Sequence, residues 1–173
     1  IAKACIEMGK VKTGALIVVE QTQSLAEYER TGIDVDAIVT SQLLINIFEK
    51  NTPLHDGAVI IKNNRIVAAT CYLPLTDRND LNKDLGTRHR AALGLSEVSD
   101  AIVIVISEET GTISIAFDGE LVRGFDAESL KTEILKYTLP SDMPRRAMAE
   151  LGVTKKIINK KAKKSKNKEE ENE

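Results

Sequence analysis

The chain has 173 residues, and its 24 Lys and Arg against 26 Asp and Glu give a formal net charge of −2. That charge is unevenly divided, because residues 155–173 hold eight Lys and four Glu, a net +4, which leaves 16 basic and 22 acidic residues, a net −6, in residues 1–154. An acidic body argues against nucleic acid as the main partner, since binding to a phosphate backbone needs clustered cations on the folded surface.

The body is long enough for one domain with its own hydrophobic core. No apolar run reaches the roughly 18–20 residues that cross a bilayer. The chain opens at Ile1, without an initiator Met and inside a segment that is typical of a helix. We therefore expect a domain excised from a longer protein, with any anchor or targeting segment outside this sequence.

Segments rich in Val and Ile recur along the chain, and their length and β-branched content predict strands. They are residues 14–19, 58–61, 66–72, 101–106 and 112–117. The uninterrupted runs are typical of strands covered on both faces. Asn63-Asn64 predicts a tight hairpin between the second and third, because Asn tolerates the positive φ of such turns. A turn around Gly111 is expected to join the fourth and fifth strands in the same way.

Residues 33–39 alternate apolar side chains with Asp34 and Asp36, which predicts a further short strand with one solvated face. Three helical patterns complete the set. The first begins after Thr40-Ser41 and ends before Pro53. The second begins with Thr87 as its N-cap, and the third begins after Asp126, whose carboxylate would cap it. Strands mixed with helices in this way predict a single α/β domain with a central mixed parallel/antiparallel β-sheet flanked by α-helices.

The two cysteines, Cys5 and Cys71, lie in apolar surroundings without CxxC spacing. We expect free buried thiols in a reducing compartment, not a disulfide or a zinc site. Residues 155–173 are Lys- and Glu-rich and lack aromatic side chains, so they are expected to form a disordered tail after a domain of residues 1–154. Weak attraction of this tail to anionic lipid is an alternative, which its four Glu residues disfavour.

A His and an Asp stand directly before a predicted buried strand, in the sequence Pro53-Leu54-His55-Asp56-Gly57-Ala58. A carboxylate at a strand end can serve as a metal ligand or a base, and the adjacent glycine lets a ligand approach the backbone. An ordinary Asp-Gly turn with a surface His explains the same residues.

A predicted helix begins in Gly86-Thr87-Arg88-His89-Arg90. Helix N-termini attract anions, and guanidinium groups add charge-assisted donors, so this segment suits a polyphosphate. Two Arg residues in a first turn oppose the helix dipole, which weakens an isolated helix unless an anion binds there.

Two further segments could contribute to such a site. Ser107-Glu108-Glu109 ends a strand and could hold phosphate and metal, although an exposed acidic turn is the simpler explanation. Tyr72-Leu73-Pro74-Leu75 also ends a strand and could flank a purine ring, or belong to the core.

Taken together, these segments resemble the diadenylate cyclase (DAC) domain family. Asp56-Gly57-Ala58 and, about thirty residues later, Arg88-His89-Arg90 match the paired DGA and RHR motifs of that family. The order and spacing of the predicted strands fit over roughly residues 1–138. Within the family the chain is most similar to the membrane-anchored CdaA type, in which transmembrane helices precede the cyclase domain.

The resemblance implies that the protein condenses two ATP into cyclic di-AMP with release of two pyrophosphates. Asp56 would bind a divalent metal, Mg²⁺ or Mn²⁺, with His55 beside it. The catalytic set would be Asp56, Arg88, His89 and Arg90. ATP would be bound by Gly57, Ala58, Tyr72, Leu73, Leu75, Gly86, Thr87, Arg88, His89, Ser107 and Glu109.

The resemblance also implies partners and a location. Each nucleotide must be nucleophile and electrophile for the other, so two sites must face each other in a head-to-head homodimer. The domain would lie in the cytoplasm of a bacterium, attached to a membrane anchor, and regulators of the full-length protein would be its other partners. A nucleotide-binding module that senses ATP or cyclic di-AMP without turnover is the alternative.

Overall fold

The computed structural model describes residues 1–78, 81 and 85–138. The chain divides into two compact units, Ile1–Asp126 and a second that begins at Ala127. In the second unit the description is confined to one helix, α5 (Ala127–Thr138), which begins directly after Asp126 as expected. The expected tail and the boundary at residue 154 lie outside the described residues, so they stay predictions.

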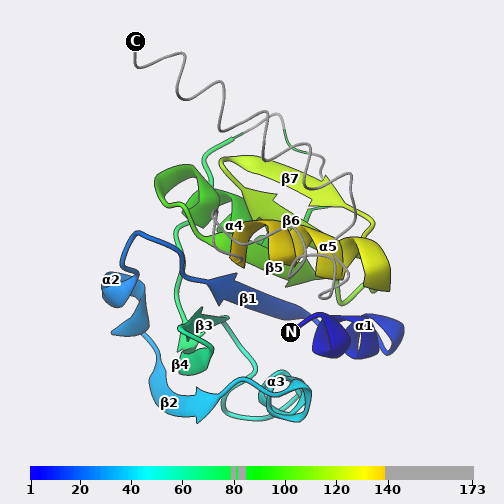
Figure 1. The fold of residues 1–173 in the computed structure, drawn as a ribbon, viewed down its shortest axis with the longest axis horizontal. Coiled ribbons are helices and arrows are strands. Elements are labelled where there is room, and N and C mark those ends of the chain that lie inside the picture. The colour runs from blue at the N-terminus through cyan, green and yellow to red at the C-terminus, as the bar shows by residue number, and fades with distance from the viewer. Residues whose placement is uncertain (79–80, 82–84, 139–173) are drawn as a thin grey trace, which may run out of the picture. The chain divides into compact units, whose positions relative to one another are not determined.

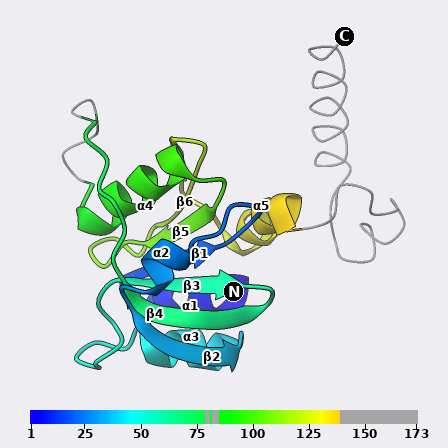
Figure 2. The same cartoon turned by 90° about the vertical axis from the view of Figure 1, so that its left-hand side faces the viewer.

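The first unit is built on a seven-stranded sheet with the strand order β2-β4-β3-β1-β5-β6-β7 (Figure 1). Its strands are β1 (Ala15–Val19), β2 (Ile33–Ile38), β3 (Ala58–Lys62), β4 (Arg65–Cys71), β5 (Ile102–Ile106), β6 (Ile113–Phe117) and β7 (Glu120–Arg123). Its helices are α1 (Ala2–Lys10), α2 (Ala26–Glu29), α3 (Ser41–Ile47) and α4 (Thr87–Val98). Figure 2 shows β2, β4 and β3 lying one above another at one end of the sheet.

β1 is the strand around which the sheet is mixed. It pairs in parallel with β3, where Ile17 lies opposite Val59, and antiparallel with β5, where Ile17 lies opposite Ile104. The remaining neighbours pair antiparallel. The α2–β2–α3 segment carries the chain across to the parallel neighbour, because a parallel pair cannot be joined by a tight hairpin. The predicted α/β fold with a mixed sheet is confirmed.

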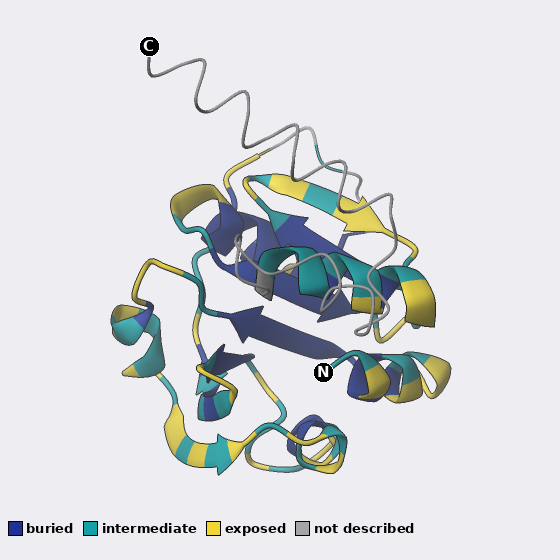
Figure 3. Ribbon diagram, viewed as in Figure 1, coloured by how far each residue is buried: buried dark blue, intermediate teal, exposed yellow. Residues whose placement is uncertain are grey.

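Side chains of alternate strand residues separate the core into two faces. One face packs against α4 and α2 through a cluster that includes Leu16, Val103, Ala92 and Leu95. On the other side α1 packs against α3 and contacts β5 and β6. Every residue of β1 and β5 is buried, whereas the edge strands β2 and β7 carry exposed residues (Figure 3). The predicted strands covered on both faces are therefore confirmed.

The short elements depart most from the sequence pattern. Asn63 and Asn64 do form the β3–β4 hairpin with φ of 48° and 61°, as predicted. The strand expected over residues 33–39 is interrupted by a bulge between Asp34 and Ala37, with Asp36 at φ 45°, so its two faces do not alternate cleanly. Neither α2 nor β7, each of four residues, was predicted.

Gly94 fixes the distance between α4 and the irregular segment of residues 74–76 that crosses it. A Cβ at residue 94 would lie 2.2 Å from the carbonyl oxygen of Pro74 and 2.7 Å from the backbone nitrogen of Thr76. Thr76 is anchored to the same helix, since its backbone N–H donates to the carbonyl of Arg90 and its hydroxyl lies 2.7 Å from a carboxylate oxygen of Glu97. The backbone of this segment therefore rests directly on the helix.

Gly94→Ala should lower the free energy of unfolding by roughly 1–3 kcal/mol, because overpacking forces backbone shifts. Val98→Ala is the matched control on the same helix, since Val98 is exposed and such changes usually stay within about 0.5 kcal/mol. Urea titration followed by circular dichroism measures both. Equal stability of the Gly94 variant and the wild type would contradict the close contact.

Candidate active site

The mixed pairing brings four chain segments to one end of the sheet. β1 and β3 begin at this end because they are parallel, and β5 ends there because Ala15 lies opposite Ile106. β4 also ends there, since Ala58 lies opposite Cys71. The residues just before β3 and just after β4 and β5 are therefore neighbours, although they are far apart in the sequence.

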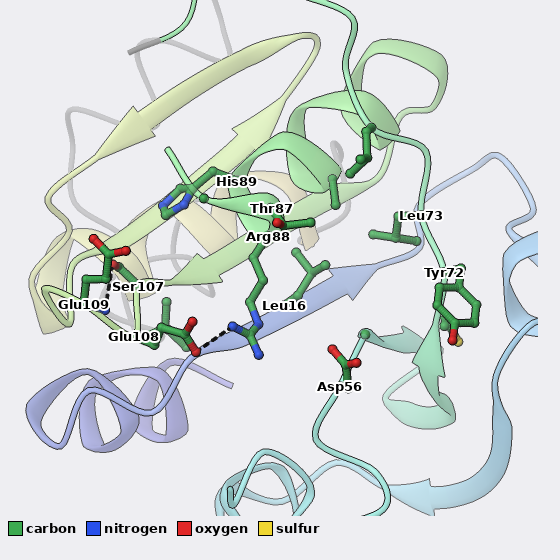
Figure 4. A pocket seen from close by; sticks show the side chains of 16 residues that line it. Leu16, Asp56, Tyr72, Leu73, Thr87, Arg88, His89, Ser107, Glu108 and Glu109 are labelled. Atoms are coloured by element: carbon green, nitrogen blue, oxygen red, sulfur yellow. Dashed lines mark hydrogen bonds and ion pairs between the residues drawn. The ribbon is translucent and has the colours of Figure 1, made fainter. Parts of the chain in front are cut away.

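A pocket of about 590 Å³ lies at this end, beneath the N-terminus of α4 (Figure 4). Most of the residues predicted to bind nucleotide line it: Asp56, Gly57, Tyr72, Leu73, Leu75, Gly86, Thr87, Arg88, His89, Ser107 and Glu109. Three predicted residues do not line it: His55, Ala58 and Arg90. The two sequence motifs thus supply opposite walls of one pocket.

Asp56 and Gly57 sit on a strained part of the backbone. Gly57 has φ of 92°, and a Cβ there would lie 2.8 Å from the carbonyl carbon of Thr70. Thr70 itself has φ of 58°, a conformation that a β-branched residue rarely adopts, and the β3–β4 register shifts beside it. Strain of this kind persists where the surrounding fold holds it, and here it fixes the approach of Asp56 to the pocket.

The N-terminus of α4 forms the opposite wall. The expected cap at Thr87 was wrong: Gly86 is the N-cap, in an extended conformation, and its carbonyl accepts the backbone N–H groups of His89 and Arg90. Thr87 already takes helical geometry and lines the pocket. Gly86 brings no side-chain oxygen, so the free N–H groups of the first turn remain available to an anion.

His89 is 4% exposed, and its Nε2 atom is buried without a hydrogen-bond partner in the described structure. Burial lowers the pKa of this imidazole below 6.5, and the nearby positive charge of Arg123 lowers it further. His89 is therefore neutral at pH 7. It can act toward a phosphate as a hydrogen-bond donor but not as a cation.

Arg88 reaches across the pocket to the turn after β5. Its Nη1 donates to Oε2 of Glu108 at 2.9 Å, and the two side chains are 24% and 53% exposed. The pair lies over the bare backbone of Gly14, where a Cβ would be 2.8 Å from that nitrogen. Figure 4 shows the guanidinium between α4 and Glu108, with Asp56 on the far side of the pocket.

The turn after β5 is tightly organised around Ser107. Its hydroxyl accepts the backbone N–H groups of Glu109 and Thr110, each at 3.3 Å, and its carbonyl accepts the N–H of Gly111 at 2.8 Å. Gly111 has φ of 75° and closes the turn into β6, as expected for a hairpin. The turn holds Glu109 at the pocket, and the hydroxyl of Ser107 stabilises the turn.

The apolar wall follows β4. Tyr72 is 74% exposed and Leu75 is 52% exposed, while Leu73 packs against the core (Figure 4). Exposed large apolar side chains at a pocket mouth offer a surface for a flat ring. The backbone of Tyr72 is fixed, since its N–H donates to Oγ1 of Thr31 at 2.9 Å.

The acidic side chains fit a metal that arrives with its ligand. No cluster of three or more His, Cys, Asp or Glu suited to hold a metal occurs among the described residues. Mg²⁺ is commonly held by one or two carboxylates together with substrate phosphates, which Asp56 on one wall and Glu109 on the other can supply. The Nδ1 of His55 lies 2.6 Å from the Thr52 carbonyl, which it can reach only as donor, so only Nε2 of that ring remains for a metal.

Five lining residues were absent from the predicted ATP-binding set. They are Leu16, Cys71, Ala91, Ile106 and Glu108, of which Glu108 belongs to the candidate segment Ser107-Glu108-Glu109. The four apolar ones adjoin predicted segments, and only the pairing of the strands shows that they share a wall. Burial raises the pKa of the Cys71 thiol to about 12, so it stays protonated. Both cysteines are free and buried, as expected.

Comparison with known protein families identifies the family of the domain that carries this pocket. The model of the DAC family, described as "DisA bacterial checkpoint controller nucleotide-binding", matches residues 2–121. That span contains every residue that lines the pocket. The chain belongs to this family. The resemblance inferred from the two motifs is thereby confirmed.

Curated relatives of this DAC domain bear cyclase names. "Cyclic di-AMP synthase CdaA" of Bacillus subtilis is 54% identical over 131 residues, which is 76% of this chain and 48% of that protein. "Diadenylate cyclase" of Listeria monocytogenes is 56% identical over 136 residues, which is 79% of this chain and 50% of that protein. The chain spans about half the length of the curated relatives it matches.

Solved structures share the fold. A crystal structure of a double mutant of DacA from Staphylococcus aureus has a TM-score of 0.79 and 47% identity, over 80% of this chain and 93% of that one. A "hypothetical membrane spanning protein" from Bacillus cereus has a TM-score of 0.69 and 48% identity, over 72% of this chain and 61% of that one. None of the helices described here has the length and apolar character that a membrane crossing requires.

The buried, neutral His89 makes stability depend on pH. Because its folded-state pKa is lowered, protons bind the unfolded chain first as pH falls below about 6.5, and this binding favours unfolding. The free energy of unfolding should therefore decrease from pH 7.5 to 5.5, by at most about 1.4 kcal/mol per pH unit. His89→Asn should flatten this slope in urea titrations across that range.

His55, the other histidine of the chain, provides the matched control. In a His55→Asn background, the free energy of unfolding should still fall more steeply with decreasing pH when His89 is present than after His89→Asn. Equal flattening by both substitutions would contradict the assignment of the slope to His89.

Proposed function

We propose that this DAC domain is a diadenylate cyclase that condenses two ATP into cyclic di-AMP and releases two pyrophosphates. One observation carries the proposal: the carboxylate of Asp56 and the N-terminus of α4 with Arg88 form opposite walls of a single pocket large enough for a nucleotide. The cyclase names of relatives at 54% and 56% identity support it.

In each half of the proposed reaction, the ribose 3′-oxygen of one ATP attacks the α-phosphorus of the other. The new P–O bond replaces the bond between the α-phosphorus and the bridging oxygen, and pyrophosphate leaves. Asp56 would hold the divalent cation, Mg²⁺ or Mn²⁺, and accept the 3′-hydroxyl proton. The cation, when bound, would neutralise charge on the phosphates.

The remaining walls would bind and orient. Arg88 and the first-turn N–H groups of α4 would stabilise negative charge on the phosphates and on the leaving pyrophosphate. His89, neutral at pH 7, would donate a hydrogen bond. Tyr72, Leu73 and Leu75 would cover the adenine faces, and Ser107 and Glu109 would border the phosphates. Arg90 lies outside the pocket lining. To take part in catalysis, its side chain would have to contact the nucleotide of a partner subunit, or it would have to act indirectly through the position of α4.

A homodimer is required by the symmetry of the product. A pocket that holds one ATP cannot close a two-fold ring, because each nucleotide must be both nucleophile and electrophile. Two pockets facing across an isologous contact satisfy this requirement, and the rate then comes from holding the two nucleotides in proximity.

We infer further that the domain acts on the cytoplasmic side of a bacterial membrane, where ATP is available. Support comes from the CdaA relative and from the neighbour whose title calls it membrane spanning. Regulators of the full-length protein, membrane-bound or cytosolic, would be its further partners.

Asp56→Asn should remove cyclic di-AMP formation, by about 100-fold or more if Asp56 acts as general base, while the fold and most ATP affinity survive. Arg88→Ala should weaken both ATP binding and turnover. Chromatography of ATP incubated with Mn²⁺ or Mg²⁺ measures the product, and calorimetry measures ATP binding. Asp34→Asn, at an exposed edge of the sheet, is the control.

ATP binding by the wild type without release of pyrophosphate under either metal would instead establish the alternative, a module that senses nucleotides. Full activity of Asp56→Asn would remove Asp56 from the mechanism. Unchanged ATP affinity of Arg88→Ala would remove the phosphate assignment.

The dimer requirement predicts that activity depends on protein concentration. Specific activity should rise with concentration at saturating ATP and level off where sedimentation shows a dimer, while ATP affinity per chain changes little. Constant specific activity from the monomeric to the dimeric range would contradict the two-site mechanism.

A further inference from the structure

The charged side chains that line the pocket sum to a negative value. Asp56, Glu108 and Glu109 each carry a carboxylate, whereas Arg88 is the only Arg or Lys among the lining residues that the structure describes. The formal sum is −2 with His89 neutral, and it stays negative even with His89 protonated. A phosphate site is ordinarily cationic, so the acidic lining opposes the ligand that the rest of the pocket suits.

One of these carboxylates pairs directly with Arg88, the side chain proposed to bind phosphate. Glu108 accepts a hydrogen bond from Nη1 of Arg88 at 2.9 Å. The added Cβ at Gly14 would approach both partners, lying 2.8 Å from that nitrogen and 3.0 Å from the Cβ and Oε2 of Glu108. The absence of a side chain at Gly14, directly before β1, therefore leaves room for this pair, which a larger residue would crowd.

Glu109 offers an internal comparison. It carries the same charge and lines the same pocket, one residue along the same turn. Its backbone N–H donates to Ser107, but in the described structure its carboxylate is not paired with Arg88. The two neighbouring carboxylates thus separate the effect of pairing with Arg88 from the effect of negative charge in the pocket.

We propose that Glu108 is a specificity-determining residue that restricts the pocket to phosphate ligands carrying a divalent cation. This inference rests on the proposed function. A metal-free polyphosphate must displace Glu108 from Arg88 and then faces the released carboxylate. A ligand that brings a divalent cation carries less negative charge and offers the carboxylates a cation, so it binds without that penalty. Nucleotide without metal, which the proposed reaction cannot use, is thereby bound more weakly.

Calorimetric titration of ATP into the wild type, Glu108→Gln and Glu109→Gln tests this, each with excess Mg²⁺ and with EDTA. Glu108→Gln should raise the metal-free affinity roughly fivefold, the order expected for a half-exposed charge pair that water screens. Its affinity with Mg²⁺ should change less than about threefold, so the gap between the two conditions narrows. Glu109→Gln should raise the metal-free affinity clearly less.

The same titrations in an Arg88→Ala background complete a double-mutant cycle. The gain from Glu108→Gln should largely disappear there, because no guanidinium remains to be released. Glu108 is 53% exposed in a turn, so the variants should fold, and cooperative urea unfolding curves would test this.

Three outcomes overturn the inference: no gain in metal-free affinity, an equal gain from Glu109→Gln, or a full gain without Arg88. If any of these outcomes occurs while the wild type forms cyclic di-AMP normally, the proposed function remains intact. Failure of the wild type to bind ATP in Mg²⁺ overturns the proposed function and this inference together.

Discussion

The pairing of β1 with a parallel strand on one side and an antiparallel strand on the other is the constraint on which the pocket depends. In an all-antiparallel sheet, β1 and β3 would begin at opposite ends, and Asp56 would lie across the sheet from the turn after β5. The parallel register of Ile17 with Val59 and the antiparallel register of Ala15 with Ile106 bring these segments together. One crossover through α2, β2 and α3 thus brings the pocket residues to one end of the sheet.

Close contacts at three glycines then set the spacing of the pocket walls. Gly57 lies on the strained backbone of Thr70, Gly94 lies beneath Pro74, and Gly14 lies beneath the Arg88–Glu108 pair. At each of these positions a side chain would displace backbone or a charged group. The glycines therefore do more than permit turns, because each sets the spacing between two elements that carry pocket residues.

The sequence was most informative where it carries long apolar runs and characteristic turn residues. The buried strands, the hairpin at Asn63-Asn64 and the two motifs were predictable, because apolar runs and turn residues act locally. α2 and β7 were not, since four-residue elements carry too little pattern. The cap at Thr87 was wrong because Gly86 satisfies the same geometry without a side chain. The Arg88–Glu108 pair could not be predicted, because residues twenty apart meet only through the position of α4 over the sheet.

The charge of the chain acquires a definite meaning in this setting. A net charge of −6 in residues 1–154 excludes broad capture of polyanions, yet the proposed substrate is itself a polyanion. The conflict is sharper in the pocket, where carboxylates outnumber the guanidinium. Two such pockets facing each other, each with a nucleotide, would concentrate negative charge at the dimer contact. Divalent cations carried by both nucleotides would relieve that repulsion, so in the proposed dimer the acidic lining would couple metal loading to productive pairing of the two sites.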